Sequence, residues 1–295
     1  MLELQDVSTF IRRKPIVMHA TFDISPGQIV GLIGPNGAGK TTIMKTILGL
    51  TKFTGTIRIN QMLVTENNHS ALTHVGALIE HPAIYPFLTG RQNLTLYSHD
   101  QTDLMQLVTQ LELTPYIDRP AKDYSLGMKQ KLGIAIALLN QPQLVILDEP
   151  MNGLDIEATI LVRNLIKQHA AQGTTFLISS HILSELQKIM TRIILVNNGQ
   201  IIINQPIITF NQLHQTQYRL LTNDPSRTIT ALQNAQMAFT VDAPYLIIKQ
   251  ADRINSQKIL RQDDLYLTEL TPVETSFEKL IVTILEKQRG PHHEN

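Results

Sequence analysis

The fold of this chain is decided by the octapeptide Gly34-Pro35-Asn36-Gly37-Ala38-Gly39-Lys40-Thr41, which matches the pattern G-x-x-x-x-G-K-[ST] at every fixed position. Residues 28–33 before it are short, apolar and β-rich, which predicts a buried strand. Residues 42–48 after it have the pattern of an amphipathic helix that ends at Gly49. A strand, a glycine loop and a helix in this order are typical of a phosphate-binding loop.

The residue types of this loop suit a nucleoside triphosphate. The glycines permit backbone angles that turn successive N–H groups inward, and the following helix adds the positive end of its dipole. We expect Lys40 to reach the β- and γ-phosphates and the Thr41 hydroxyl to bind Mg²⁺. The predicted phosphate site comprises Gly34, Pro35, Asn36, Gly37, Ala38, Gly39, Lys40, Thr41 and Thr42.

Composition narrows the class of protein without deciding it. The 295 residues are 43% hydrophobic and 17% charged, which suits a globular protein with a sizeable core. Lys+Arg and Asp+Glu both number 25, so no basic excess points to nucleic acid or anionic lipid. The chain contains no cysteine, which excludes disulfides and thiol catalysis. Since no stretch approaches about 18 apolar residues, we expect a cytoplasmic protein, and any membrane part must be another chain.

Two groups of strands are predicted in the first part of the chain. Residues 20–24 and 56–60 have the pattern of strands in an antiparallel set. Residues 144–147 and 174–179 are nearly all apolar, as expected of parallel strands that are buried on both faces and joined by a helix. Residues 90–140 are expected to be mostly helical.

The composition changes near Pro206, and the polar, weakly patterned residues 211–217 predict a linker. Beyond it, strand-like and helical segments alternate over about 80 residues, which is enough for a small α/β domain. The expected strands are 218–221, 245–248 and 265–267, and the expected helices lie near 226–236, 254–262 and 276–287. The predicted domains are 1–208, with a helical subdomain at about 85–140, and an accessory domain at 215–295.

Asp148 and Glu149 follow the apolar segment 144–147, so they lie at the C-terminal edge of a predicted strand, where ligands bind in open α/β sheets. Alone, such a pair is more often a solvated turn. Downstream of a phosphate loop, Asp148 is expected to hold Mg²⁺ opposite Thr41, and Glu149 to orient and deprotonate an attacking water.

A third motif precedes the apolar helix 131–139 and reads Tyr124-Ser125-Leu126-Gly127-Met128-Lys129-Gln130. Here the chain resembles the nucleotide-binding subunits of ATP-binding cassette (ABC) transporters, whose signature is commonly Leu-Ser-Gly-Gly-Gln. Ser125 and Gly127 keep this pattern, whereas the positions around them depart from it. A serine hydroxyl, a glycine N–H and a helix N-terminus that converge on one point suit a phosphate. In this family that phosphate belongs to ATP held by the opposite subunit.

The resemblance implies roles for further residues. Asp155, at the end of an Asn-Gly-Leu-Asp segment, resembles the D-loop residue that crosses the dimer interface. His181 follows 174–179, taken as the last buried strand, where the family places its switch histidine. Phe10 is the nearest candidate for the aromatic ring that the family stacks on adenine, but it could equally lie in the core. The resemblance thus implies Lys40, Glu149 and His181 as catalytic residues, with ATP and Mg²⁺ as cofactors.

Glu80 stands where most members of the family have a glutamine that senses Mg²⁺ and contacts the membrane partner. A carboxylate here can bind the metal or repel Glu149, so Glu80 joins Thr41 and Asp148 as a candidate metal ligand. Residues 76–90, together with the motif that contains Ser125, resemble the branch of the family that handles peptide antibiotics, in bacitracin-type export and lantibiotic self-protection.

The sequence therefore predicts an α/β fold: a P-loop ABC nucleotide-binding domain with a parallel core sheet, an antiparallel β subdomain and a helical subdomain, followed by a small C-terminal α/β domain. The resemblance implies an ATPase subunit, dimeric and favoured as a homodimer, which powers a separate integral membrane permease at the cytoplasmic face and expels a peptide antibiotic. No nucleic-acid partner is expected. Two alternatives stay open: a soluble ABC ATPase acting on ribosomes or DNA, and an ATP-driven sensor with a permease-like partner.

Overall fold

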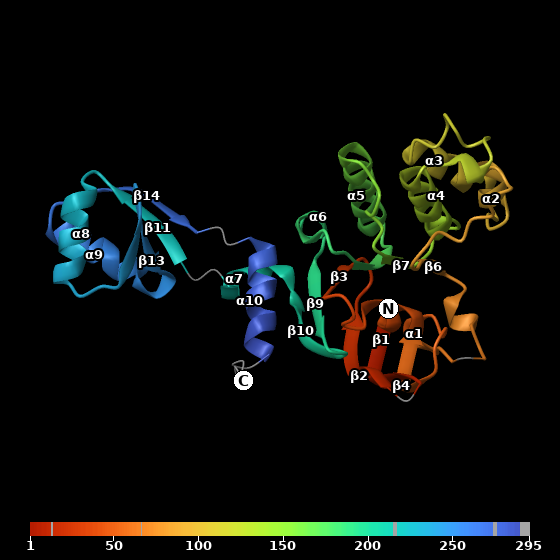
Figure 1. Ribbon diagram of the computed structural model, residues 1–295, viewed down its shortest axis with the longest axis horizontal. Coiled ribbons are helices and arrows are strands. Elements are labelled where there is room, and N and C mark those ends of the chain that lie inside the picture. Colours follow the sequence, from red (N-terminus) through yellow and green to blue (C-terminus); the bar gives the residue numbers. More distant parts are fainter. Residues whose placement is uncertain (13, 66, 215–216, 274–275, 290–295) are drawn as a thin grey trace, which may run out of the picture. The chain divides into compact units, whose positions relative to one another are not determined.

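The computed structural model describes residues 1–12, 14–65, 67–214, 217–273 and 276–289. The chain divides into two compact units, Met1–Ile207 and Ile208–Asn295, which we call the N-terminal and C-terminal units (Figure 1). Among the helices that the structure describes, none combines the length and the apolar character needed to cross a membrane.

An antiparallel sheet opens the N-terminal unit. Its strand order is β2-β1-β4-β5, with bounds β1 (Leu2–Ile11), β2 (Lys14–Ile24), β4 (Phe53–Ile59) and β5 (Met62–Leu63). In β1, Leu2 and Leu4 are buried while Glu3 and Gln5 are exposed, because alternate side chains of a strand point to opposite faces. β1 pairs antiparallel with both β2 and β4, which confirms the predicted antiparallel set.

The second sheet forms the centre of the same unit. Its order is β10-β9-β3-β8-β7-β6, with bounds β10 (Gln200–Pro206), β9 (Arg192–Asn197), β3 (Ile29–Ile33), β8 (Thr175–Ser179), β7 (Leu144–Asp148) and β6 (Val75–Leu78). All neighbours are parallel except β10 and β9. Every residue of β3, β7 and β8 is buried, as their apolar runs predicted. The assumption that 174–179 is the last buried strand was wrong, because β9 is an equally apolar strand that comes later.

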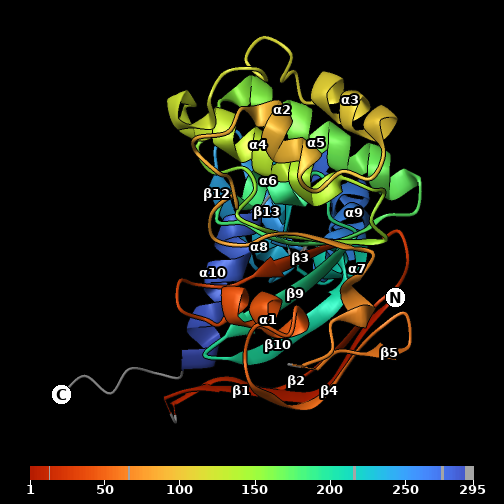
Figure 2. The ribbon, with the colours of Figure 1, turned by 90° about the vertical axis from the view of Figure 1, so that its right-hand side faces the viewer.

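Helix α1 (Lys40–Ile47) lies between the two sheets (Figure 2). Its apolar residues Ile43, Met44 and Ile47 belong to one buried cluster with residues of both sheets. The helix ends because Gly49 adopts the left-handed backbone conformation, with φ at 67°, which glycine tolerates without a Cβ penalty. Because α1 directly follows the phosphate-binding loop, this buried cluster anchors the loop to the core of the unit.

The remaining helices of this unit include the predicted helical region. They are η1 (Ser70–Leu72), α2 (Gly90–Thr95), α3 (Gln101–Gln110), η2 (Ala121–Asp123), α4 (Leu126–Leu138), α5 (Ile156–Ala171) and α6 (Leu183–Gln187). Helix α4 packs directly on β6, since a Cβ added to Gly76 would lie 1.7 Å from the carbonyl oxygen of Ala137. Only glycine permits this backbone contact, which ties the helical region to the edge of the central sheet.

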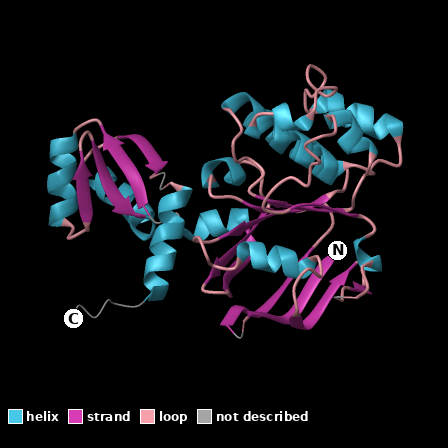
Figure 3. Ribbon diagram, turned by 45° about the vertical axis from the view of Figure 1, so that its right-hand side comes forward, coloured by secondary structure: helices cyan, strands magenta, loops and turns pink. Residues whose placement is uncertain are grey.

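The C-terminal unit contains a β-α-β-β-α-β arrangement of the ferredoxin-like type (Figure 3). Its elements are α7 (Ile207–His214), β11 (Gln217–Thr222), α8 (Pro225–Asn234), β12 (Phe239–Asp242), β13 (Tyr245–Lys249), η3 (Gln250–Asp252), α9 (Arg253–Gln262), β14 (Leu267–Pro272) and α10 (Phe277–Arg289). The sheet is antiparallel in the order β12-β13-β11-β14. One buried cluster joins the sheet to α8 and α9, so these helices cover one face.

Three details of this unit differ from the sequence prediction. Residues 211–214 of the predicted linker are helical in α7, whose Phe210 is fully buried with its ring centroid 5.5 Å from that of Phe277. The rest of that linker includes 215–216, which lie outside the described residues. The strand expected at 265–267 begins only at Leu267, and β12 was not predicted. In each case tertiary packing, which local polarity does not report, decides the element.

Candidate functional site

The phosphate loop needs glycine at three positions. A Cβ on Gly34 would lie 2.2 Å from the carbonyl oxygen of Val196 in β9. Gly37 and Gly39 adopt left-handed backbone conformations, with φ at 77° and 106°. The Lys40 ammonium donates to the carbonyl oxygens of Gly34, at 2.8 Å, and Pro35, at 3.2 Å, and thus lies across the loop.

A turn between β9 and β10 braces this loop from outside. The N–H of Gly199 donates to Ala38 O at 2.9 Å, and Gly199 O accepts from the N–H of Met18 at 2.8 Å. A Cβ on Gly199 would lie 2.3 Å from Ile16 O, and its φ is 77°. Sequence reasoning missed this glycine, although an Asn-Gly pair between two apolar runs is a strong signal for a hairpin turn.

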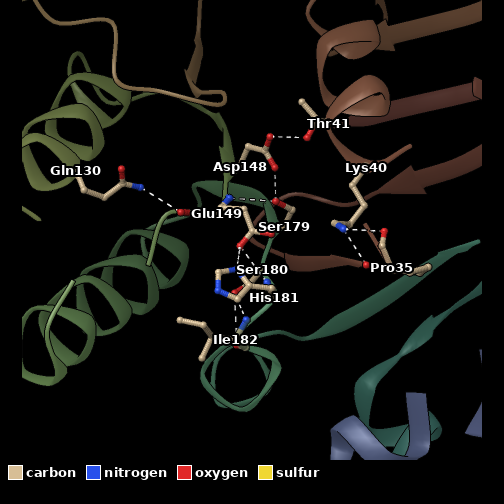
Figure 4. A network of polar contacts seen from close by, with 11 residues as sticks. Pro35, Lys40, Thr41, Gln130, Asp148, Glu149, Ser179, Ser180, His181 and Ile182 are labelled. Atoms are coloured by element: carbon tan, nitrogen blue, oxygen red, sulfur yellow. Dashed lines mark hydrogen bonds and ion pairs between the residues drawn. The ribbon is translucent and has the colours of Figure 1, made fainter. Parts of the chain in front are cut away.

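Thr41 and Asp148 meet as predicted, at the start of α1 and the end of β7. The Thr41 hydroxyl donates to Asp148 Oδ2 at 2.7 Å, and the buried Ser179 hydroxyl donates to Asp148 Oδ1 (Figure 4). Adjacent hydroxyl and carboxylate oxygens are the hard ligands that Mg²⁺ prefers, usually completed by phosphate oxygens and water. The described residues contain no group of three or more His, Cys, Asp or Glu side chains that could hold a metal alone.

Glu149 is oriented by contacts from three elements. Its N–H donates to Ser179 Oγ at 3.0 Å, and its carbonyl oxygen accepts from Gln130 Nε2 on α4 at 3.1 Å. Its carboxylate oxygen Oε2 lies 3.0 Å from the His181 main-chain N and 2.7 Å from His181 Nδ1 (Figure 4). Glu149 also has a left-handed backbone, with φ at 53°, which is uncommon outside glycine. A carboxylate fixed in this way, with 24% of its side chain exposed, can accept a proton from water.

The Lys40 ammonium shares this site with the two carboxylates. Burial lowers the pKa of Lys40, while the negative charges of Glu149 and Asp148 raise it in part. One cation faces two anions, so a polyphosphate entering the loop requires further positive charge. The Thr41–Asp148 pair is where a divalent cation would supply it.

The signature residues Ser125 and Gly127 and the D-loop residue Asp155 line a pocket of about 390 Å³. Ser125 caps α4 by accepting the N–H of Met128 at 3.2 Å, and Asp155 caps α5 by accepting the N–H of Ala158 at 2.7 Å. A Cβ on Gly127 would lie 2.9 Å from the carbonyl oxygen of Gly153, so the two segments touch. Leu126, which lines the pocket, is 63% exposed, and Ile156, next to Asp155 in the chain, is 80% exposed.

Phe10 and Glu80 are two further predicted residues. Phe10 is 52% exposed on β1, so the alternative that it belongs to the core was wrong. Glu80 Oε1 contacts Lys45 Nζ at 2.6 Å, on the exposed side of α1, and no contact joins it to Thr41 or Asp148 among the described residues. The strand-edge residues, in contrast, are brought together as the sequence indicated.

A glycine loop before a helix, a threonine–aspartate pair and a glutamate fixed by a histidine together define a P-loop nucleoside triphosphatase. A family model described as ABC transporter matches residues 17–152. Since relatives more than 30% identical are matched over more than two thirds of this chain, the chain belongs to the ATP-binding proteins of ABC transporters and is an ATPase.

Three relatives illustrate this similarity. The uncharacterized ABC transporter ATP-binding protein YhcH of Bacillus subtilis is 35% identical, over 79% of this chain and 78% of that protein. The lantibiotic transport ATP-binding protein SrtF of Streptococcus pyogenes is 38% identical, over 70% of this chain and 90% of that protein. The bacitracin transport ATP-binding protein BcrA of Enterococcus faecalis is 35% identical, over 73% of this chain and 71% of that protein.

The fold is also found in solved structures. An ATP-binding subunit of an ABC transporter superposes with a TM-score of 0.67 at 28% identity, over 72% of this chain and 92% of that chain. The predicted fold class and the resemblance to the bacitracin and lantibiotic branch are therefore confirmed.

Proposed function

We propose that this chain is the ATP-hydrolysing subunit of a transporter that expels a peptide antibiotic of the bacitracin or lantibiotic kind through a separate membrane permease. The observation that carries hydrolysis is the position of Glu149, fixed by His181 beside the Thr41–Asp148 pair. The similarity to SrtF and BcrA supports the substrate class. The balanced charge of the chain argues against action on nucleic acid.

In this proposal the phosphate loop binds the triphosphate through its inward N–H groups and Lys40. Mg²⁺ would be held by Thr41 and Asp148 and would neutralise developing charge on the β- and γ-phosphate oxygens. Oε2 of Glu149 is held by His181, so Oε1 accepts a proton from the attacking water. As the water oxygen bonds to the γ-phosphorus, the bond from that phosphorus to the β–γ bridging oxygen breaks, and ADP and inorganic phosphate are the products. His181 holds that carboxylate in place through its main-chain N–H and its ring Nδ1.

Two copies complete each site in this proposal. Within one chain, Ser125, Gly127 and Asp155 line their own pocket, and their polar groups face solvent there. A helix N-terminus with a serine suits the phosphates of a nucleotide bound by a second copy. The exposed Leu126 and Ile156 would be covered when two copies close around the nucleotides.

The permease is proposed to contact the surface after Glu80. Four large side chains are exposed there: Tyr85, Phe87, Leu96 and Tyr97, with Phe87 at 74%. The rings of Tyr85 and Phe87 lie 5.8 Å apart and form a small aromatic projection. Exposed aromatic residues mark interaction sites, and this surface would hold the chain at the cytoplasmic face of the membrane.

Copurification tests the proposal. The Glu149→Gln variant, purified from detergent-solubilised membranes with ATP and Mg²⁺, is expected to retain a polytopic membrane protein that mass spectrometry identifies. Lys40→Ala, which loses the phosphate contact, serves as the control and should retain less. Cells that lack the chain should become more sensitive to bacitracin or a lantibiotic. Recovery of ribosomal proteins or nucleic acid instead would contradict the transport function.

A further inference from the structure

Lys45 is placed to compete with a metal for Glu80. Lys45 and Thr41 are four residues apart on α1, so they lie on one face of the helix, about 6 Å apart along its axis. Thr41 contacts Asp148 at 2.7 Å, whereas Lys45 Nζ holds Glu80 Oε1 at 2.6 Å. The third candidate metal ligand is thus held one helical turn away from the other two.

The backbone around Glu80 is unusually tight. Glu80 adopts a left-handed conformation, with φ at 60°, which is uncommon for a residue other than glycine. The N–H of His81 donates to Ile79 O at 2.7 Å, and the N–H of Ile84 donates to Pro82 O at 2.9 Å. Strain of this kind persists only where the surroundings maintain it, and it clusters at switch regions.

The same segment packs closely on α4. A Cβ on Gly133 would lie 2.7 Å from Pro82 Cβ and 3.1 Å from Leu78 Cδ1, so no space separates α4 from the segment that carries Glu80. Helix α4 begins at the cap residue Ser125 and also contacts the main chain of Glu149 through Gln130. A movement of Glu80 would therefore displace α4, which begins at the signature residue Ser125.

We propose that Lys45 is a positioning residue that keeps the Glu80 carboxylate off the metal site until ATP and Mg²⁺ are bound, an inference that rests on the metal site of the proposed function. Glutamate, unlike the usual glutamine, carries a charge, so it can form an ion pair with Lys45 or bind a metal ion. In the free chain its partner is Lys45. On loading, Glu80 leaves Lys45 for the metal, and the segment from Leu78 to Pro82 moves with it against α4.

A double-mutant cycle of Lys45 and Glu80 tests this exchange by metal binding instead of turnover. In the hydrolysis-deficient Glu149→Gln background, Mn²⁺ binding in the presence of ATP is measured by electron paramagnetic resonance for the parent, Lys45→Gln, Glu80→Gln and the double variant. Lys45→Gln should tighten Mn²⁺ binding about three-fold, the effect expected of releasing one partly exposed ion pair. The same change should have no effect once position 80 is glutamine, and Lys45→Arg should behave as the parent.

Four outcomes separate the possibilities. Coupling between the two substitutions supports the exchange. If Lys45→Gln changes Mn²⁺ affinity equally with Glu80 and with Glu80→Gln, Lys45 acts on the metal by its charge alone, and the exchange is overturned. If Lys45→Gln changes Mn²⁺ affinity in neither background, Lys45 does not act on the metal, and the exchange is likewise overturned. If the parent binds no Mn²⁺ with ATP, the metal site of the proposed function fails instead. Melting temperatures of all five proteins, Lys45→Arg included, verify folding.

Discussion

His181 fixes Glu149 through two contacts to one carboxylate oxygen. The main-chain N of His181 lies 3.0 Å from Glu149 Oε2, and its ring Nδ1 lies 2.7 Å from the same atom. With the proton on Nδ1, both groups donate, so Oε1 stays free to accept a proton from water. The His181 side chain is 59% exposed, so its ring is accessible from solvent.

His181→Gln should lower kcat by about 100-fold or more, the usual contribution of one positioned acid–base group. The main-chain contact to Glu149 remains in this variant, so ATP affinity should change little. Steady-state kinetics together with calorimetric ATP binding separate the two quantities. An unchanged kcat would remove His181 from the hydrolytic site.

Ser179→Ala should destabilise the chain and weaken metal binding. The buried Ser179 hydroxyl donates to Asp148 and accepts the N–H of Glu149 at 3.0 Å, so its loss costs about 1–3 kcal/mol of unfolding free energy. It should also raise the Mg²⁺ concentration needed for half-maximal ATPase activity. Ser180→Ala is the matched control, because within the described part of the chain the Ser180 hydroxyl bonds only to the nearby Ile182. An identical Mg²⁺ requirement in the two variants would contradict the role of Ser179.

Gly34→Ala should abolish ATP binding. The new Cβ would lie 2.2 Å from Val196 O, and relieving that clash must shift the loop, at a cost of about 1–3 kcal/mol. Gly173→Ala is a control that is strained in its backbone without a steric clash, since φ is 104° and no atom lies within 4 Å of the added Cβ. Both variants should unfold more easily in urea, but only Gly34→Ala should lose ATP. Normal ATP affinity in Gly34→Ala would show that the loop does not need this glycine.

His169 should make the chain less stable below about pH 6.5. Burial lowers the pKa of His169, while the charge of Asp103 raises it in part, so the folded state binds its proton at lower pH than the unfolded state. The contribution to stability is therefore present above the unfolded pKa and is lost as pH falls. Urea unfolding between pH 7.5 and 5 measures this fall. In His169→Gln the fall should be smaller, and an equal fall in both proteins would assign it to other groups.

The sequence predicted those parts of the site whose residues lie in one contiguous motif. The phosphate loop and the Asp148-Glu149 pair follow apolar strands, so their position at the sheet edge results from the local pattern alone. Thr41 follows β3 through the phosphate loop, and Asp148 ends β7. The contact between them therefore required only that β3 and β7 end at the same edge of the sheet. The parallel core and the antiparallel set were predictable for the same reason.

Other features depend on contacts between distant segments. The brace from Gly199, the bond from Gln130 to Glu149 O and the Lys45–Glu80 pair each join residues that no motif relates. Residues 211–214 of α7 were predicted to be linker because polar side chains dominate the local pattern, whereas burial of the adjacent Phe210 favours the helix. Contacts of this kind can be identified only from the folded structure, because no local sequence pattern indicates them.

The account depends most on Glu149 as the residue that takes a proton from the attacking water. The most direct measurement is single-turnover hydrolysis: Glu149→Gln is mixed with radiolabelled ATP and Mg²⁺, and bound nucleotide is separated and identified over time. We predict that the variant retains intact ATP, with hydrolysis slowed at least about 100-fold relative to the unchanged chain. Formation of ADP and phosphate at the rate of the unchanged chain would contradict the assignment.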